Sequence, residues 1–153
     1  MAVALLDSNV LVHASYRGSL HYANSARLLA LGLGKSGRFC IAPQNLVEFA
    51  AVVTRKRFVD PPMTAADVLR ISDLLYRSRR LSKIYPQRGT VLRTMREGHA
   101  LSIQGPRWYD LFLAVTMRDA ALKVIITENV NDFSSIPFIT ALTIERAVKE
   151  YGA

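Results

Sequence analysis

The sequence is poor in cysteine, histidine and acidic residues. Its 153 residues include one cysteine, three histidines and twelve Asp or Glu, against twenty Lys or Arg. A single cysteine, Cys40, excludes an intramolecular disulfide, and its apolar neighbours predict a buried thiol in a protein from a reducing compartment. The three histidines show no zinc-ligand spacing, so we expect no zinc site.

Long apolar runs and glycine-rich phosphate loops are also missing. No apolar run approaches the ~18 residues needed to span a bilayer, and the first residues lack the basic region of a signal peptide. Gly32, Gly34 and Gly37 follow an expected helix instead of opening one. No Ser-His-Asp or Cys-His arrangement is readable. We therefore expect a cytoplasmic protein that does not enter membranes.

The composition favours one globular domain with an acidic partner. Half of the residues are hydrophobic, which is enough for a real core, and 153 residues fit one domain spanning residues 1–153. The formal net charge is +8. Such a charge favours nucleic acid, an anionic membrane or an acidic protein as partner, although a merely soluble basic protein is the alternative.

Short apolar segments alternate with segments of helical periodicity along the chain. The pattern predicts strands at residues 2–6, 38–42, 83–85, 123–127 and 138–141, and helices at residues 21–33, 43–58, 64–79, 88–101, 107–122 and 144–151. This alternation is typical of the α/β class, in which a parallel sheet is flanked by helices on both faces.

Three acids stand where an ordinary surface acid would not. Asp7 ends the first apolar strand, and ligands of open parallel sheets bind beyond the carboxyl ends of the strands. Glu48 lies alone among apolar residues, and Asp110 shares a helix face with apolar residues. Such acids are costly unless they are paired or bind metal. The alternatives are a helix cap for Asp7 and ion pairs with Arg55 and Arg107 for the other two.

A further polar cluster, residues 127–133, follows the strand at residues 123–127. It brings Thr127, Glu128, Asn129 and Asp132 to the same expected edge as Asp7, although a polar turn capping a helix is the alternative. Carboxylates that converge repel one another, and a hard divalent cation relieves the repulsion. All-oxygen ligands favour Mg²⁺ or Mn²⁺.

These four segments together resemble the acidic motifs of the PIN domain, and the size of the chain is most similar to VapC-type toxins. The segments that carry the resemblance are residues 5–11, 45–48, 109–114 and 127–133, which span nearly the whole chain in the family's order. The resemblance implies a PIN-like parallel sheet with the acids at its carboxyl edge. It also implies Mg²⁺- or Mn²⁺-dependent hydrolysis of RNA, a homodimer and inhibition by a cognate antitoxin.

The resemblance also implies roles for individual residues. Asp7 and Asp110 would hold the metal most directly, and Glu48 would act nearby. The fourth acidic position falls on Asp132, Asn129 or Glu128, of which Asp132 is the nearest acid in the matching segment. The residues expected to support the site are Ser8, Asn9, Thr127 and Asn129.

Basic residues are concentrated between Arg70 and Arg107, a segment with nine Lys or Arg and only two acidic residues. This excess predicts a track for RNA phosphates, and a solvated helix face is the alternative. The candidate RNA-binding residues are Arg77, Arg79, Arg80, Lys83 and Arg107.

Two other functions fit parts of the pattern. A non-catalytic RNA-binding PIN-like module would keep the fold, but RNA binding alone would not favour buried acids. A metal-dependent phosphatase of another α/β family would often carry an acid two residues after Asp7, where this chain has Asn9.

Overall fold

The computed structural model describes residues 1–152, and a parallel sheet forms their centre. Its strand order is β3-β2-β1-β4-β5, and every neighbouring pair is parallel. The strands are β1 (Ala4–Leu6), β2 (Phe39–Ile41), β3 (Ser82–Lys83), β4 (Val124–Ile126) and β5 (Thr140–Leu142). The α/β class predicted from the alternation is therefore confirmed.

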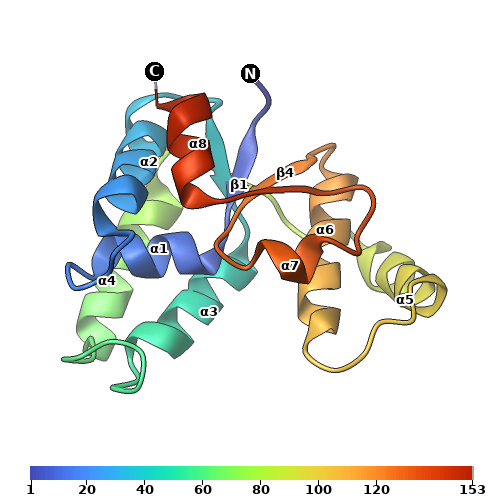
Figure 1. Ribbon diagram of the computed structural model, residues 1–153, viewed down its shortest axis with the longest axis horizontal. Coiled ribbons are helices and arrows are strands. Elements are labelled where there is room, and N and C mark those ends of the chain that lie inside the picture. The colour runs from blue at the N-terminus through green and yellow to red at the C-terminus, as the bar shows by residue number, and fades with distance from the viewer. Residues whose placement is uncertain (153) are drawn as a thin grey trace.

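Helices cover both faces of the sheet (Figure 1). One face carries α1 (Ser8–Ser15), α2 (Tyr22–Gly34), α3 (Pro43–Val53), α4 (Ala65–Arg77) and α8 (Ile144–Tyr151). The other face carries α6 (Arg107–Asp119) and α7 (Val130–Phe133), while α5 (Thr90–Ala100) packs on the outside of α6. Among residues 1–152, no helix combines the length and apolar character needed to cross a membrane.

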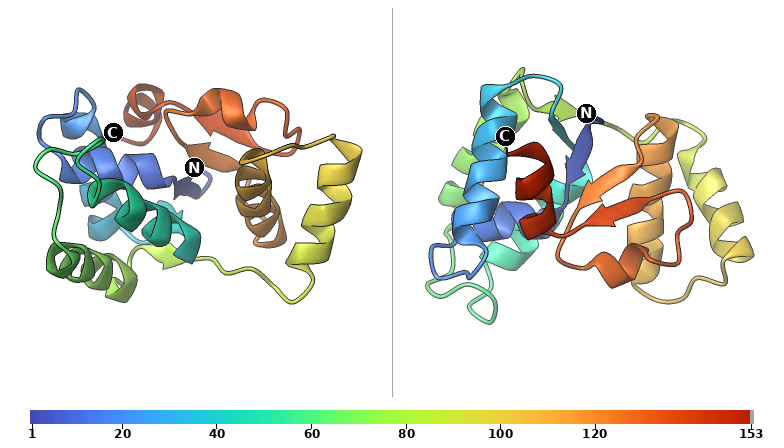
Figure 2. Two further views of the ribbon diagram at one scale, coloured as in Figure 1. Left: turned by 90° about the horizontal axis from the view of Figure 1, so that it is seen from below. Right: turned by 45° about the horizontal axis from the view of Figure 1, so that its top comes forward.

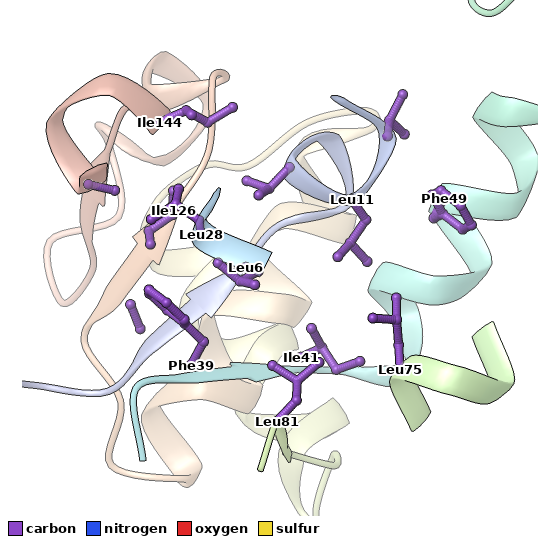
Figure 3. Close-up of a cluster of buried hydrophobic side chains, with 14 of the residues drawn as sticks. Leu6, Leu11, Leu28, Phe39, Ile41, Phe49, Leu75, Leu81, Ile126 and Ile144 are labelled. Carbon is purple, nitrogen blue, oxygen red and sulfur yellow. The ribbon is translucent and has the colours of Figure 1, made fainter. Parts of the chain in front are cut away.

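Successive side chains of each central strand enter different cores. In β1, Ala4 and Leu6 join the core under α1, α2, α3 and α8, and Leu5 joins the core under α6. Figure 3 shows Leu6 among the side chains of the first core. Burying one such leucine stabilises the fold by about 1.5–3 kcal/mol. Cys40 lies on the α6 side, where burial raises the pKa of its thiol to about 12, as the prediction of a buried thiol required.

The helix expected at residues 43–58 is shorter than predicted. It ends at Val53, and the chain then turns, with the Phe58 and Val59 amides donating to the Arg55 carbonyl. Val59 is buried in the core, which requires the chain to fold back at this point. The turn moves Phe58 out of the helix and onto the surface, beside α1 and α3.

The remaining boundaries differ by a few residues. A separate helix, α1, follows Asp7 directly, where only a turn or cap was expected. The third strand is Ser82–Lys83 instead of 83–85, and the last is Thr140–Leu142 instead of 138–141. α4 begins with a capping box, in which the Thr64 hydroxyl accepts from the Asp67 backbone amide at 3.1 Å.

The carboxyl ends of the strands meet at one edge of the sheet. β1 leads directly into α1, and β2 leads into α3. Viewed from below, as in the left panel of Figure 2, α1 and α3 lie on one side of this edge and α6 lies on the other. The fold thus places Asp7, Glu48 and Asp110 around a common edge.

Candidate active site

Asp7 is both a helix cap and the most buried acid of this edge. Its Oδ1 accepts from the Ser8 amide at 2.8 Å and so caps α1. Only 6% of its surface is exposed. Burial raises the pKa of this carboxyl, hydrogen bonds from Thr127 and Ser8 lower it, and the charge of Glu48 raises it. The cap alternative is therefore correct, and it holds the carboxylate at the sheet edge.

A buried hydroxyl joins the first strand to the fourth. Thr127 follows β4, is fully buried and donates from Oγ1 to Asp7 Oδ2 at 2.8 Å. The side-chain amide of Asn9 donates to both Asp7 Oδ2 and Thr127 Oγ1. The Asn129 backbone amide also donates to Thr127 Oγ1. The expected support by Thr127 and Asn9 is therefore visible as a closed set of hydrogen bonds around one carboxylate.

Glu48 is fixed by two polar neighbours. Its Oε2 accepts from the Ser8 hydroxyl at 3.0 Å, and its Oε1 accepts from the Gln44 amide at 2.7 Å. The Gln44 amide also donates to the Tyr109 carbonyl, which joins α3 to α6. Among the ion pairs of residues 1–152, none joins Glu48 to Arg55. The ion-pair alternative for Glu48 is therefore wrong.

Asn45 belongs to the segment at residues 45–48 and is a site residue that was not predicted from the sequence. It is fully buried, its Oδ1 accepts from the Ala42 amide at 2.8 Å, and its Nδ2 lies 3.5 Å from Asp7 Oδ1. Asn45 thus caps α3 and touches Asp7. Its place two residues after Pro43, where a side chain can cap a helix, was the available signal. Gln44 offered no comparable signal.

Asp110 stands in the first turn of α6, and within residues 1–152 its carboxylate has neither a hydrogen-bond donor nor an ion-pair partner. Burial raises the pKa of this half-buried carboxyl to about 7, with added effects of the charges of Asp132, Asp7 and Glu48. The charge of Arg107 opposes this rise in the pKa, and the Arg107 guanidinium donates to the Ser135 hydroxyl. The alternative of an ion pair between Asp110 and Arg107 is therefore not found among residues 1–152.

The candidates for the fourth acidic position separate in space. Asp132 lies on α7, and it is the charge that raises the pKa of Asp110 most. Glu128 points elsewhere: Oε1 accepts from the Ile144 amide at the start of α8, and Oε2 lies 3.7 Å from His21 Nε2. Asn129 caps α7. Asp132 is therefore the candidate that faces the other acids.

The donors fit a cation that is held by few protein ligands. Within residues 1–152 no three His, Cys, Asp or Glu side chains are close enough together to form a ready-made metal cage. Mg²⁺ keeps several waters and commonly binds through one or two carboxylates, so it needs no such cage. An unpaired acid whose pKa is raised by three other acids is what a divalent cation stabilises. The donor set therefore fits Mg²⁺ or Mn²⁺.

Most of the basic residues expected to bind RNA are occupied elsewhere. Arg77 pairs with Asp73, Lys83 donates to the Ser78 and Leu81 carbonyls, and Arg80 donates to the Gly34 carbonyl. Gly34 and Arg80 both precede strands, so they lie at the amino edge, opposite the acids. Arg79 is exposed, and Arg107 alone of the five lies one turn from Asp110.

The fold and the acids define a class of α/β proteins with an acidic site at the carboxyl edge of a parallel sheet. A family model described as the PIN domain matches residues 4–139, so the chain belongs to the PIN domain family. The resemblance found in the four acidic segments is therefore confirmed. No curated protein sequence matches the chain.

Solved structures with the same fold come from several bacteria. DNA-bound VapBC from Salmonella typhimurium is 20% identical, with a TM-score of 0.62 over 94% of this chain and 99% of that one. VapBC-1 from nontypeable Haemophilus influenzae is 15% identical, with a TM-score of 0.63 over 94% and 98%. VapC20 from Mycobacterium tuberculosis, a toxin that cleaves the sarcin-ricin loop, is 10% identical, with a TM-score of 0.61 over 81% and 87%. At these identities the likeness establishes the fold.

Proposed function

We propose that the chain is a metal-dependent endoribonuclease that hydrolyses RNA phosphodiester bonds. The observation that carries the proposal is Asp110, a half-buried acid without a side-chain partner, whose pKa is raised by burial and further by the charges of Asp132, Asp7 and Glu48. A protein that only bound RNA would gain nothing from four acids facing a polyanion. The net charge of +8 supports a polyanionic substrate around that acidic edge.

The residues of the site would have separate roles in binding the metal ion and in activating the water. Asp7 and Asp110 would hold a Mg²⁺ or Mn²⁺ ion, with Asp132 as the additional acid. The bound ion would supply charge neutralisation at the attacked phosphate and a lowered pKa for water. Glu48 keeps lone pairs on both carboxylate oxygens beyond the bonds from Ser8 and Gln44, so it would orient the attacking water and accept its proton.

The remaining polar groups keep the acids in place. The hydrogen bonds of Thr127, Asn9 and the Ser8 amide fix Asp7, so its carboxylate does not reorganise during the reaction. Ser8 Oγ joins the Asp7 segment to Glu48, and Gln44 joins Glu48 to the backbone of α6. No histidine is needed for the hydrolysis.

A cleavage assay tests the proposal. Wild-type protein is incubated with labelled single-stranded RNA in Mg²⁺, in Mn²⁺ and in EDTA, and Asp110→Asn is run beside it. We expect cleavage with either ion and none in EDTA or with the variant. Asp73→Asn, which removes an exposed acid of α4, is the matched control and should cleave normally. Equal activity in EDTA, or full activity of folded Asp110→Asn, would contradict the proposal, and RNA binding without cleavage would favour the binding-module alternative.

We also propose that the enzyme is the toxin of a type II toxin–antitoxin pair. The support is the shared fold with VapC20, which is named a toxin, and with the VapBC structures. A short neighbouring reading frame encoding a DNA-binding protein would supply the antitoxin. Co-expression of that protein should yield a complex that no longer cleaves RNA, and persistence of full activity in the complex would refute the pairing.

The homodimer implied by the resemblance remains a proposal. Exposed apolar side chains gather on one flank, where Val91 and Met95 of α5 adjoin Tyr109 of α6, and Leu92 of α5 is exposed as well. A second copy of the chain would remove this apolar surface from water. Light scattering should give twice the chain mass for wild type and the single mass for Leu92→Asp with Met95→Asp, and a wild-type monomer at high concentration would refute the dimer.

A further inference from the structure

A cavity of about 260 Å³ opens beside the acids and has no part in the chemistry proposed above. Its walls are Ser8, Asn9, Val12, His13, Val52, Phe58 and Asn129. Ser8 and Asn9 also donate hydrogen bonds to Glu48 and Asp7. A group seated in the cavity would therefore lie directly next to the place where the phosphodiester is cut.

The walls combine apolar and hydrogen-bonding surface. Val12, Val52 and Phe58 supply the apolar part, and the Phe58 ring is 48% exposed. Within residues 1–152, the Asn129 side-chain amide has no hydrogen-bond partner. The volume is below the ~300–1,000 Å³ of sites for drug-sized ligands, so it suits one flat group of the size of a nucleobase.

His13 adds one more polar group to the wall. Its Nδ1 is paired with the Ser19 hydroxyl at 2.7 Å, which leaves Nε2 as the ring nitrogen for a ligand. Burial lowers the pKa of His13, the charge of His21 lowers it further, and Glu128 opposes both. The ring is therefore neutral near pH 7, and it offers a hydrogen bond to a neutral base edge instead of a positive charge.

Three consecutive cations directly precede Phe58, a wall residue of the same cavity. Arg55, Lys56 and Arg57 are exposed, and none of them takes part in an ion pair within the described residues. The guanidinium carbons of Arg55 and Arg57 lie 5.1 and 5.6 Å from the centroid of the Phe58 ring. The unpaired positive charge of the two arginines is therefore gathered around the Phe58 ring.

We propose that this cavity binds the base of a nucleotide next to the cut phosphate, with Phe58 stacking on the base and Arg55, Lys56 and Arg57 binding the adjoining phosphates. Asn129 and His13 would contact the edge of the base. The proposal rests on the ribonuclease function, and it adds that the substrate is single-stranded at this point. A base that is stacked in a helix cannot enter such a cavity, whereas an unpaired base can stack on an aromatic side chain.

The first test measures whether binding depends on the base. The affinity of the metal-free chain in EDTA is measured by fluorescence anisotropy, for a short single-stranded RNA and for an abasic backbone of the same length. Stacking on one aromatic side chain predicts a preference for the base-bearing RNA of about 5- to 100-fold. Phe58→Ala should lose most of this preference, and Phe58→Trp should keep it.

Tyr85→Ala is the matched control, because Tyr85 is 50% exposed and lies outside the cavity. It should keep the preference of wild type. An unchanged preference in Phe58→Ala, or no preference in wild type, would overturn the proposal. Cleavage of the same RNA in Mn²⁺ is recorded separately. Cleavage without base-dependent binding would support the nuclease and refute the base site. Base-dependent binding without cleavage would support the base site and refute the nuclease.

The second test concerns the three cations. Replacing Arg55 and Arg57 together by Gln should reduce the slope of log affinity against log salt by about 1.4, since each contact with a single-strand phosphate contributes about 0.7. Replacing Arg79 and Arg80 by Gln is the matched control and should leave the slope unchanged. If the slope is instead reduced by replacing Arg79 and Arg80 and unchanged by replacing Arg55 and Arg57, the RNA track expected between Arg70 and Arg107 is supported. That result would overturn the proposal that Arg55, Lys56 and Arg57 bind the phosphates.

Discussion

Replacing Asp110 by Asn should stabilise the metal-free protein. The pKa of Asp110 is raised from 3.8 to about 7. Below about pH 4 the carboxyl is protonated in both the folded and the unfolded chain, so it does not lower the free energy of unfolding. As pH rises from about 4 to 7, the unfolded chain loses this proton first, and the free energy of unfolding falls. The penalty is complete above pH 7. Asn carries no charge and avoids it.

The size of the effect follows from the shift. About three pKa units at 1.36 kcal/mol each give a ceiling of ~4 kcal/mol. Because Asp110 is only half buried, solvent screening reduces this to about 1–2 kcal/mol. For a chain of this length that corresponds to a rise in Tm of about 2–8 °C at pH 8, with a smaller rise near pH 4.5.

Thermal melts of wild type and Asp110→Asn, in EDTA and in Mn²⁺, measure this directly. Mn²⁺ at a hundred times its Kd should stabilise wild type by about 2.7 kcal/mol and the variant much less. Asp119→Asn is the contrasting control, because Asp119 is bound by Arg93 and Thr90 and its pKa is lowered. It should melt lower with or without metal. The acid cluster would be refuted if Asp110→Asn had a lower Tm than wild type in EDTA and if Mn²⁺ did not change the Tm of wild type.

Three further changes test the rest of the site. Asp7→Asn should keep the helix cap but lose Mg²⁺-dependent RNA cleavage, as measured by cleavage and by circular dichroism, and retained cleavage would remove Asp7 from the site. Thr127→Val should lower the free energy of unfolding in urea by about 1–3 kcal/mol, because buried Asp7 and Asn9 lose a partner, and Thr127→Ser should restore it. Gln44→Ala should reduce kcat on the order of 10-fold with KM nearly unchanged, since it positions Glu48, and a change in KM alone would place Gln44 in substrate binding instead.

The sequence predicts the strands and the acids well because both are local signals. A short apolar run ending in an acid, such as residues 2–7, predicts a buried strand and a group at its carboxyl end. Glu48 and Asp110 stand out against apolar neighbours for the same reason. The resemblance carried by the order of the four segments then implies a common edge, and in the structure the charges of Asp7 and Glu48 act on Asp110.

What the sequence does not predict depends on contacts between distant segments. The apolar pattern continues from α3 to Phe58, but the burial of Val59 ends the helix at Val53. The basic residues between Arg70 and Arg107 can be counted in the sequence, whereas the bonds that occupy Arg77, Arg80 and Lys83 cannot. The cavity joins α1, the Phe58 turn and Asn129, and no single motif contains all three.

The acids come from two ends of the chain, and this separation has a consequence for biosynthesis. Asp7 and Glu48 belong to the first 53 residues, while Asp110 and Asp132 belong to α6 and α7. Thr127, which holds Asp7, is itself late in the chain. A nascent chain that has not yet released α6 and α7 from the ribosome therefore holds only two of these four acids. If the chain is a ribonuclease, the messenger and the ribosome that make it are safe from it until translation is nearly complete.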